Sequence, residues 1–155
     1  MKLINYIFLS KIVLICLVFS QLKGKIIAEE IIFAHAIVTT NSGIKIPVEV
    51  ADTHGKRRLG LGNRSFLKKN WGMLFIFDKR KTHRFWMKNM KFPLDIIWLD
   101  NRRIVHILKN VQPVKFGEIP KILEPLVPAN FVLEIAAGRS TELQLKHGDH
   151  LEYKF

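Results

Sequence analysis

The chain has 155 residues, of which 48% are hydrophobic and 25% charged, and this composition excludes both intrinsic disorder and a polytopic membrane protein. Its formal net charge is +12, from 25 basic and 13 acidic side chains. The length predicts one domain, and the excess of positive charge favours anionic partners.

The first 28 residues differ from the rest of the chain and predict an export signal. Lys2 and Lys11 precede an uninterrupted apolar run over 12–19, and residues 1–28 hold no acidic side chain. A charged start followed by a short apolar stretch is typical of a secretory signal peptide. If Lys11 snorkels to the membrane surface, the same segment serves as an uncleaved membrane anchor. Both alternatives predict a domain at 29–155 in the periplasm or on the extracytoplasmic face of the cytoplasmic membrane.

The single cysteine, Cys16, lies in this leader and limits the chemistry of the remaining residues. The segment 29–155 has no thiol for nucleophilic catalysis, for a disulfide or for a cysteine-ligated metal. We therefore expect a domain without a cofactor.

The first half of the domain predicts strands separated by one short helix. Residues 31–39 form an apolar run suited to a strand, and residues 44–50 alternate strictly between apolar and polar side chains. Pro47 lacks an amide hydrogen, which predicts that this second strand lies at a sheet edge. Residues 53–64 are basic and predict a short helix, whereas 72–77 are apolar on both faces, as in a central strand.

The second half continues with short strands around one long connection. After a charged turn at 78–83, the expected strands span 84–89, 94–99, 104–108, 131–137 and 150–155. Four prolines between residues 112 and 130 predict a long ordered connection that covers the core or borders a site. A helical turn is expected at 138–145. The predicted fold is mainly β (α+β), with a small, mostly antiparallel, barrel-like sheet and one or two short helices.

Short motifs follow one another in a specific order along the domain. They are Arg57…Gly60-Leu61…Arg64, Gly72-Met73-Leu74-Phe75, Phe85-Trp86-Met87-Lys88-Asn89, Pro93-Leu94-Asp95-Ile96-Ile97, Pro128-Ala129…Val132-Leu133-Glu134, Ala137-Gly138 and Gly148-Asp149. Over residues 44–155 this order resembles the DUF192 family (UPF0127). The resemblance implies a compact, β-rich, barrel-like domain, often behind a bacterial export signal, and it implies no particular biochemical activity. Leu59, Gly62 and Met90 depart from the family pattern, in which Arg, Met and Thr are usual.

The segment 84–89 is the leading candidate for a ligand-binding site. Alternation places its cations and Trp86 on one side of the expected strand. A tryptophan between cations stacks a sugar ring or another planar ligand, while amide and carboxylate groups bind hydroxyls. The expected ligand-binding residues are Arg57, Arg84, Trp86, Lys88, Asn89 and Asp95. In the structural alternative, Trp86 packs under the proline-rich connection and Asp95 neutralises Lys88 or Arg57.

Three carboxylates are candidates for acid and base catalysis, namely Asp95, Glu134 and Asp149. Glycoside hydrolysis needs two carboxylates about 5–9 Å apart, one of them with a raised pKa. Glu134 lies between Leu133 and Ile135 in an apolar strand, where burial raises the pKa of a carboxyl that has no partner. In a basic domain an Arg or Lys partner is the structural alternative, so we expect binding without turnover.

Two further patterns are interpreted as surface features. His147, Asp149 and His150 lie within four residues, but their spacing differs from that of a helical metal-binding pair, so we expect a surface turn and no metal site. Basic clusters attract anionic polymers. The clusters are Lys56-Arg57-Arg58, Lys68-Lys69 and Lys79-Arg80-Lys81. For an exported protein, these polymers are anionic lipid, lipopolysaccharide or wall polymers, and no nucleic acid is expected.

The sequence thus predicts one leading function and two alternatives. The leading function is that of an exported, envelope-associated domain that binds a polar or anionic ligand, such as a glycan, a glycolipid or an anionic polymer. The first alternative is a carbohydrate-acting hydrolase that uses Asp95 and Glu134. The second is a protein–protein interaction module of an envelope complex, which presents the strand at 44–50 as an exposed edge.

Overall fold

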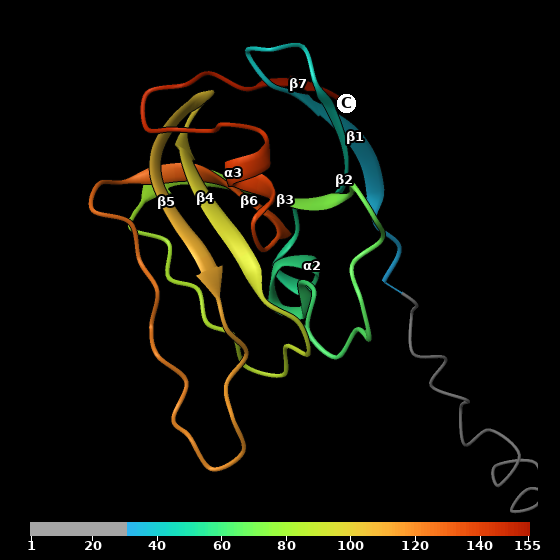
Figure 1. Ribbon diagram of the computed structural model, residues 1–155, viewed down its shortest axis with the longest axis vertical. Helices are drawn as coiled ribbons and strands as arrows, with labels where there is room; N and C mark the ends of the chain where they lie inside the picture. Colours follow the sequence, from blue (N-terminus) through green and yellow to red (C-terminus); the bar gives the residue numbers. More distant parts are fainter. Residues whose placement is uncertain (1–30) are drawn as a thin grey trace, which may run out of the picture. The chain divides into compact units, whose positions relative to one another are not determined.

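The structure is a computed structural model that describes residues 31–155, and the leader predicted at 1–28 lies outside the described residues. The described segment forms a curled sheet with two short helices (Figure 1). Its elements are β1 (Ala34–Thr39), β2 (Lys45–Ala51), α2 (His54–Leu59), β3 (Gly72–Lys81), β4 (Leu94–Asp100), β5 (Arg103–Val111), β6 (Ala129–Ala136), α3 (Arg139–Glu142) and β7 (Glu152–Lys154). Within this segment, no helix has the length and apolar character needed to cross a membrane.

The sheet has seven strands in the order β5-β4-β6-β3-β2-β1-β7. Neighbouring strands are antiparallel except for β2 and β3, which run parallel. A parallel pair needs a connection that returns the chain to the starting end of the sheet, and α2 lies in that connection. The predicted class, a mostly antiparallel barrel-like sheet with short helices, is confirmed, as a curled half-barrel.

The two edges of the sheet meet at one end of the curl. The amide of Ile104 in β5 donates to the carbonyl of Asp149 at 2.8 Å, and the amide of Gly148 donates to the carbonyl of Ile104 at 2.9 Å. The amide of Leu151 donates to the carbonyl of Arg102 at 2.8 Å. The segment that leads into β7 therefore closes this end of the half-barrel against β5.

Apolar side chains cover both faces of the central strands. The inner cluster lies inside the curl and takes buried residues from β1 to β6 and from the segment before β7, such as Val38, Ile46, Leu74, Leu133 and Leu151. The outer cluster lies on the opposite face of the same strands and includes Met73, Phe75, Ile96, Trp98 and Val132. Because β3, β4 and β6 are covered on both sides, their sequences are nearly continuous apolar runs. The prediction of a central strand at 72–77 is confirmed.

The prediction that the strand at 44–50 lies at an edge is wrong. β2 pairs with β1 over Lys45–Val50 and with β3 over Val48–Ala51. Pro47 precedes the stretch that is paired with β3, so its missing amide hydrogen does not interrupt that ladder. The second alternative function loses the exposed edge on which it was based.

The predicted turn at 78–83 and the predicted strand at 84–89 are also wrong. β3 continues to Lys81, and the segment after it forms only an isolated bridge between Phe85 and Leu123. A tight turn then follows, in which the amide of Met90 donates to the carbonyl of Met87 at 3.3 Å. The expected alternation of side chains persists, because Phe85 and Met87 point inward while the residues between and beside them are exposed.

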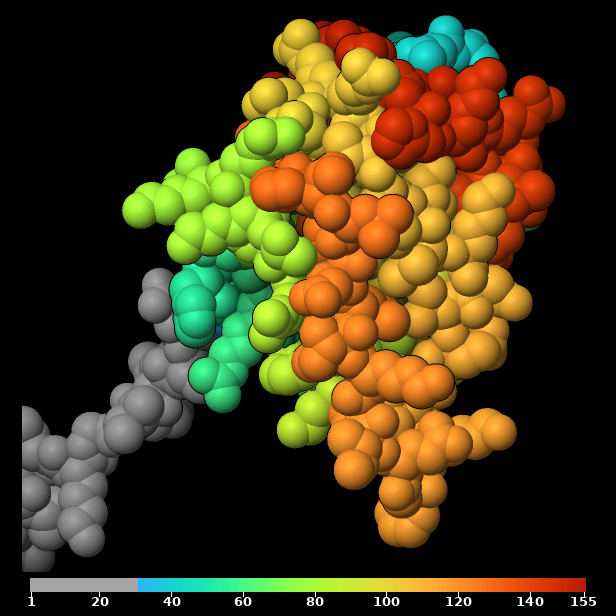
Figure 2. All heavy atoms as spheres, turned by 90° about the vertical axis from the view of Figure 1, so that its left-hand side faces the viewer, coloured from blue at the N-terminus to red at the C-terminus, as the bar shows by residue number. Residues whose placement is uncertain are grey.

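The long proline-containing connection between β5 and β6 is confirmed. It runs over one face of the domain, and its tip projects beyond the neighbouring loops (Figure 2). Phe116, Ile119 and Leu126 are exposed on it. Near its end, Leu123 exchanges two backbone hydrogen bonds with Phe85, of 2.8 and 2.9 Å, which fix the connection beside the segment 84–90.

Candidate ligand-binding cleft

A cleft of about 280 Å³ opens on the outer face of the sheet, between α2 and the segment 84–90. Its floor holds the aromatic rings of Phe75, Phe77 and Phe85, and the Phe75 and Phe85 rings meet edge to face with centroids 5.0 Å apart. The volume is close to the lower limit for small-molecule sites, and the apolar floor is typical of such sites.

Five cationic or titratable basic side chains line this cleft and give it a positive rim. They are His54, Arg57, Arg58, Arg84 and Lys88. Three come from α2 and two from the segment after β3, so the two sides of the cleft carry the same sign of charge. Among the lining residues, Glu134 is the one acid. Convergent positive charge above an apolar floor attracts an anion into a partly desolvated site.

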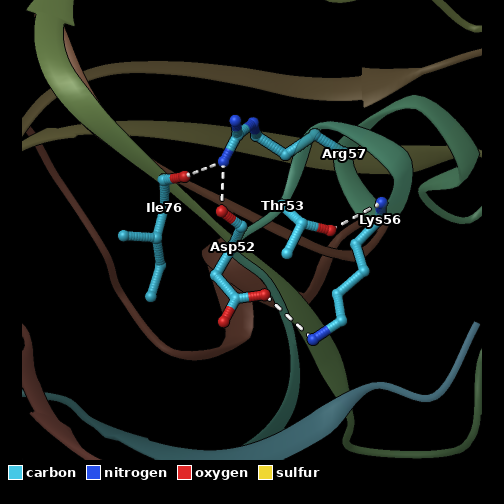
Figure 3. Close-up of polar contacts among 5 residues, drawn as sticks. All are labelled: Asp52, Thr53, Lys56, Arg57 and Ile76. Atoms are coloured by element: carbon cyan, nitrogen blue, oxygen red, sulfur yellow. Dashed lines mark hydrogen bonds and ion pairs between the residues drawn. The ribbon is translucent and has the colours of Figure 1, made fainter.

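Arg57 is held in place by the backbone on two sides (Figure 3). Its Nη1 donates to the carbonyl of Asp52 at 2.6 Å and to the carbonyl of Ile76 at 2.7 Å, and its guanidinium lies 5.1 Å from the centre of the Phe77 ring. The other two guanidinium nitrogens point away from these carbonyls. Arg57 therefore fastens α2 to β3 and retains donors beside the cleft.

The start of α2 is fixed by its own side chains (Figure 3). The hydroxyl of Thr53 accepts a hydrogen bond from the amide of Lys56 at 3.3 Å and caps the helix. The ammonium of Lys56 donates to Asp52 at 2.9 Å, and this hydrogen bond lowers the pKa of the Asp52 carboxyl. Lys56 is thus engaged at the helix start and is absent from the cleft lining, unlike His54, Arg57 and Arg58.

The segment 84–90 brings three of the predicted residues to the rim. The side chain of Trp86 is 58% exposed, so it lies at the surface rather than packed under the proline-containing connection. Arg84 Nε lies 3.1 Å from Glu124 Oε2 in a solvent-exposed ion pair. Lys88 is exposed at the rim. The predicted grouping of Arg57, Arg84, Trp86 and Lys88 at one site is therefore present.

Asn89 does not line the cleft. Its backbone is left-handed, with φ of 61°, a conformation that asparagine adopts more readily than most residues. Its carbonyl accepts a hydrogen bond from the amide of Asn63 at 2.9 Å. The asparagine therefore serves the turn that ends the segment.

Asp95 does not line the cleft, and its hydrogen bonds give it a structural role. It is fully buried and accepts hydrogen bonds from the amides of Asn110 at 2.8 Å, Gly138 at 3.2 Å and Ser140 at 2.8 Å. These bonds join the end of β5 and the start of α3 to β4. These contacts include neither Lys88 nor Arg57, and they use the carboxyl that we expected to bind a ligand.

The two predicted catalytic carboxylates lie on opposite faces of the sheet. In the pairing of β4 with β6, Asp95 is opposite Ile135 and Glu134 is opposite Ile96. Directly opposed residues share a face and successive residues alternate, so Asp95 points to the inner side and Glu134 to the outer side. The two groups do not face one substrate, and the hydrolase alternative lacks its acid and base pair.

Glu134 lies at the base of the cleft and is 6% exposed. Among residues 31–155, none donates a hydrogen bond to its carboxyl or forms an ion pair with it, so the expected Arg or Lys partner is missing. Burial raises the pKa of Glu134 to about 8. At neutral pH the group is a neutral acid that offers one hydrogen-bond donor and one acceptor.

Near the C-terminus, His147 lies in a turn, and His150 forms an isolated antiparallel bridge with Arg103. Asp149 Oδ2 accepts a hydrogen bond from the amide of Lys146 at 3.0 Å, and the Asp149 carbonyl pairs with β5. Across residues 31–155, no group of His, Cys, Asp and Glu side chains has the arrangement of a metal site.

Sequence reasoning missed His54, Arg58, Phe75 and Phe77 as cleft residues. The two basic residues are neighbours of Arg57 on a helix whose start was recognised. The two phenylalanines alternate along β3 toward the outer face, which the period of two could have assigned. The face of the sheet that carries the cleft is determined by tertiary packing, and the local periodicity of the sequence does not predict it.

The curled sheet and the cation-lined cleft define a small β-rich domain with a candidate ligand site. The family model DUF192, described as Uncharacterized ACR, COG1430, matches residues 36–153, and the chain belongs to this family. The family predicted from the motif order is thus confirmed.

Two crystal structures are similar to this chain over most of its length. A candidate transcription regulator from Sinorhizobium meliloti 1021 is 31% identical, with a TM-score of 0.71, and the match covers 80% of this chain and 97% of that chain. A protein of unknown function from Novosphingobium aromaticivorans DSM 12444 is 32% identical, with a TM-score of 0.66, and the match covers 81% of this chain and 89% of that chain. Comparison with curated proteins gives no match.

Proposed function

We propose that this domain binds a small anionic ligand, an anionic sugar of the glycan or glycolipid class in the cell envelope, within the cleft between α2 and the segment 84–90. The observation that carries the proposal is the convergence of cations from two separate segments on an aromatic floor. The anionic group of the ligand contacts the basic rim, and its ring lies over the apolar floor.

Arginine and tryptophan side chains suit this chemistry. A guanidinium binds phosphate or carboxylate groups through several N–H donors in one plane. Arg57 is already fixed by two carbonyl groups, so less side-chain entropy is lost when it binds an anion. The exposed ring of Trp86 at the rim offers a stacking surface for a sugar.

Binding without turnover is the function that this cleft supports best. The cleft contains one carboxyl group, that of Glu134, whereas glycoside hydrolysis requires two that flank the same bond. The positive rim concentrates anions at the opening.

Isothermal titration calorimetry of the full chain with glucose 1-phosphate tests the proposal, with glucose as the uncharged probe. We expect saturable binding of the phosphate, with glucose at least tenfold weaker. Lys88→Gln should weaken binding several-fold, since a rim cation is lost, whereas Lys91→Gln removes an exposed charge outside the cleft lining and should have little effect. Similarly, Trp86→Ala should weaken binding and Phe66→Ala should not.

A DNA duplex is the competing probe, because the Sinorhizobium meliloti relative is described as a candidate transcription regulator. We expect no saturable binding of the duplex at 150 mM salt. The proposal is overturned if the duplex binds and glucose 1-phosphate does not, or if the cleft and control variants weaken phosphate binding equally.

A further inference from the structure

We infer that the Glu134 carboxyl is the hydroxyl-recognition group of the cleft, the side chain that selects a hydroxylated ring. The inference rests on the proposed function and deepens it, because it distinguishes a sugar anion from an apolar anion of the same size and charge.

The position of Glu134 is the first observation. In the sheet, it is opposite Met73 of β3 and Ile96 of β4, both of which belong to the outer apolar cluster. An aliphatic side chain would pack at this position without loss of solvation. A carboxyl group instead lies at the base of a cleft, where 94% of the residue is buried and no described residue bonds to it. Its oxygens are not among the fully enclosed side-chain atoms that lack a partner, so they reach the space of the cleft and can bond to a ligand there.

The cations of the cleft do not supply that partner. From α2, the groups that line the cleft are His54, Arg57 and Arg58, and from the segment after β3 they are Arg84 and Lys88. β3 and β4 present apolar side chains to this face. Arg57 is bonded to two backbone carbonyls and Arg84 to Glu124, so both are already held at the rim. The floor and the rim are therefore chemically distinct, with a carboxyl below and cations above.

A sugar hydroxyl matches this floor. It donates one hydrogen bond and accepts others, while a protonated carboxyl has an O–H donor and a carbonyl acceptor. Burial keeps the Glu134 carboxyl protonated at neutral pH, with a pKa of about 8. A neutral group avoids repulsion of the ligand anion, and its hydrogen bonds are formed away from bulk water.

Two probes of similar shape and equal charge test the inference. Glucose 1-phosphate and cyclohexyl phosphate share a six-membered ring and a phosphate, but cyclohexyl phosphate has no hydroxyl groups. By calorimetry of the full chain at pH 7, we expect glucose 1-phosphate to bind about tenfold more tightly, as one satisfied hydrogen-bonding group predicts. Glu134→Leu should reduce this preference to below threefold, whereas Glu134→Gln, which keeps a donor and an acceptor, should retain most of it.

The pH profile separates hydrogen bonding from a packing effect. As pH rises from 7 to 9.5, the affinity of the wild type for glucose 1-phosphate should fall about tenfold, because Glu134 ionises beneath the phosphate. Glu134→Gln should show no comparable fall, since its amide does not titrate. The other charged or titratable groups of the cleft are His54, Arg57, Arg58, Arg84 and Lys88, and they are the same in the wild type and in Glu134→Gln. Glu152→Gln, which removes an exposed carboxylate of β7, is the matched control and should follow the wild type.

The outcomes distinguish the inference from the function on which it rests. If neither phosphate binds, the proposed function fails. If both bind with equal affinity, or if Glu134→Gln keeps the wild-type pH profile, the function stands and the inference is overturned. Should Glu134→Leu fail to fold, the comparison of the wild type with Glu134→Gln decides by itself.

Discussion

The buried carboxyl of Glu134 makes the stability of the protein depend on pH. Its pKa is about 8 in the folded protein, against an ordinary value of 4.5 that applies to the unfolded chain. Between these values the folded state retains a proton that the unfolded state has lost, so the free energy of unfolding falls as pH rises. The full stability is present below pH 4.5, and the loss ends near pH 8, where both states are ionised.

Replacement of this carboxyl by an amide should therefore remove a loss of stability that accompanies rising pH. The slope that Glu134 contributes to the free energy of unfolding is about −1.4 kcal/mol per pH unit between pH 4.5 and 8. For Glu134→Gln this contribution disappears, so its stability relative to the wild type should rise across that window by a few kcal/mol. Urea unfolding at pH 5 and pH 7.5 measures the difference. If the difference in unfolding free energy between Glu134→Gln and the wild type is the same at both pH values, the pKa of Glu134 is not raised.

At the scale of elements, Arg57 couples the position of α2 to that of β3. The helix has six residues and no fully buried side chain, so its own packing contributes little to its placement. The two hydrogen bonds from Arg57 Nη1 to the carbonyls of Asp52 and Ile76 supply a fixed attachment. One wall of the cleft is thus located by a single guanidinium.

Arg57→Lys should weaken this attachment although the charge is kept. The terminal nitrogen of lysine is one bond closer to the backbone than Nη1, so it does not reach the point between the two carbonyls, and the contact of the guanidinium with the Phe77 ring is also lost. We expect a loss of about 1–2 kcal/mol in the free energy of unfolding. The matched variant Arg58→Lys, on the same helix, has no such pair of carbonyl partners among the described residues and should change stability by less than about 0.5 kcal/mol. Chemical denaturation measures both variants, and equal effects would show that the carbonyl contacts do not hold α2.

Elements with strong local patterns were predictable, and those that depend on tertiary pairing were not. The hairpin of β4 and β5 follows from two apolar runs around Asn101, which adopts the left-handed backbone that its turn needs. The segment 84–89 has strand-like alternation, but Leu123 pairs with Phe85 alone, so no ladder forms. Alternation of apolar and polar residues predicts which side chains are buried, but it does not predict whether a neighbouring strand is present to pair with.

The candidate site was predictable to a similar extent. The rim residues Arg84, Trp86 and Lys88 were identified from local order. Asp95 was misassigned because its three amide partners come from the end of β5 and from residues 138–140, which are distant in sequence. In the sequence, Asp95 and Glu134 look the same, because each is a single carboxyl residue in an apolar strand. The strand pairing places them on opposite faces of the sheet, and this separates the anchored Asp95 from the unpartnered Glu134.

For the whole molecule, closure of the half-barrel depends on the residues that lead into β7. Leu151 is fully buried in the inner cluster, and its amide bonds to the carbonyl of Arg102. The edges of the sheet are thus held together by both backbone pairing and apolar packing, while the ligand cleft lies on the other face.

Leu151→Ala should destabilise the domain strongly without altering the ligand site. Removal of a fully buried leucine side chain costs about 2–5 kcal/mol of unfolding free energy. Leu126→Ala, in the exposed proline-containing connection, makes the same chemical change and should cost less than about 0.5 kcal/mol. Thermal unfolding of both variants gives the comparison. Similar melting temperatures for the two would contradict closure by the C-terminal segment.

The place of β7 in the sheet has a consequence for how the protein is made. β7 is the last strand of the described segment and pairs with β1, its first strand. During synthesis, this edge of β1 has no partner until β7 has emerged from the ribosome, and pairing between segments so distant in sequence is slow. A nascent chain that stops before residue 148 leaves the inner apolar cluster open on one side. We expect chaperones and proteases to act on such a chain, so synthesis of residues 148–155 should influence the yield of folded protein.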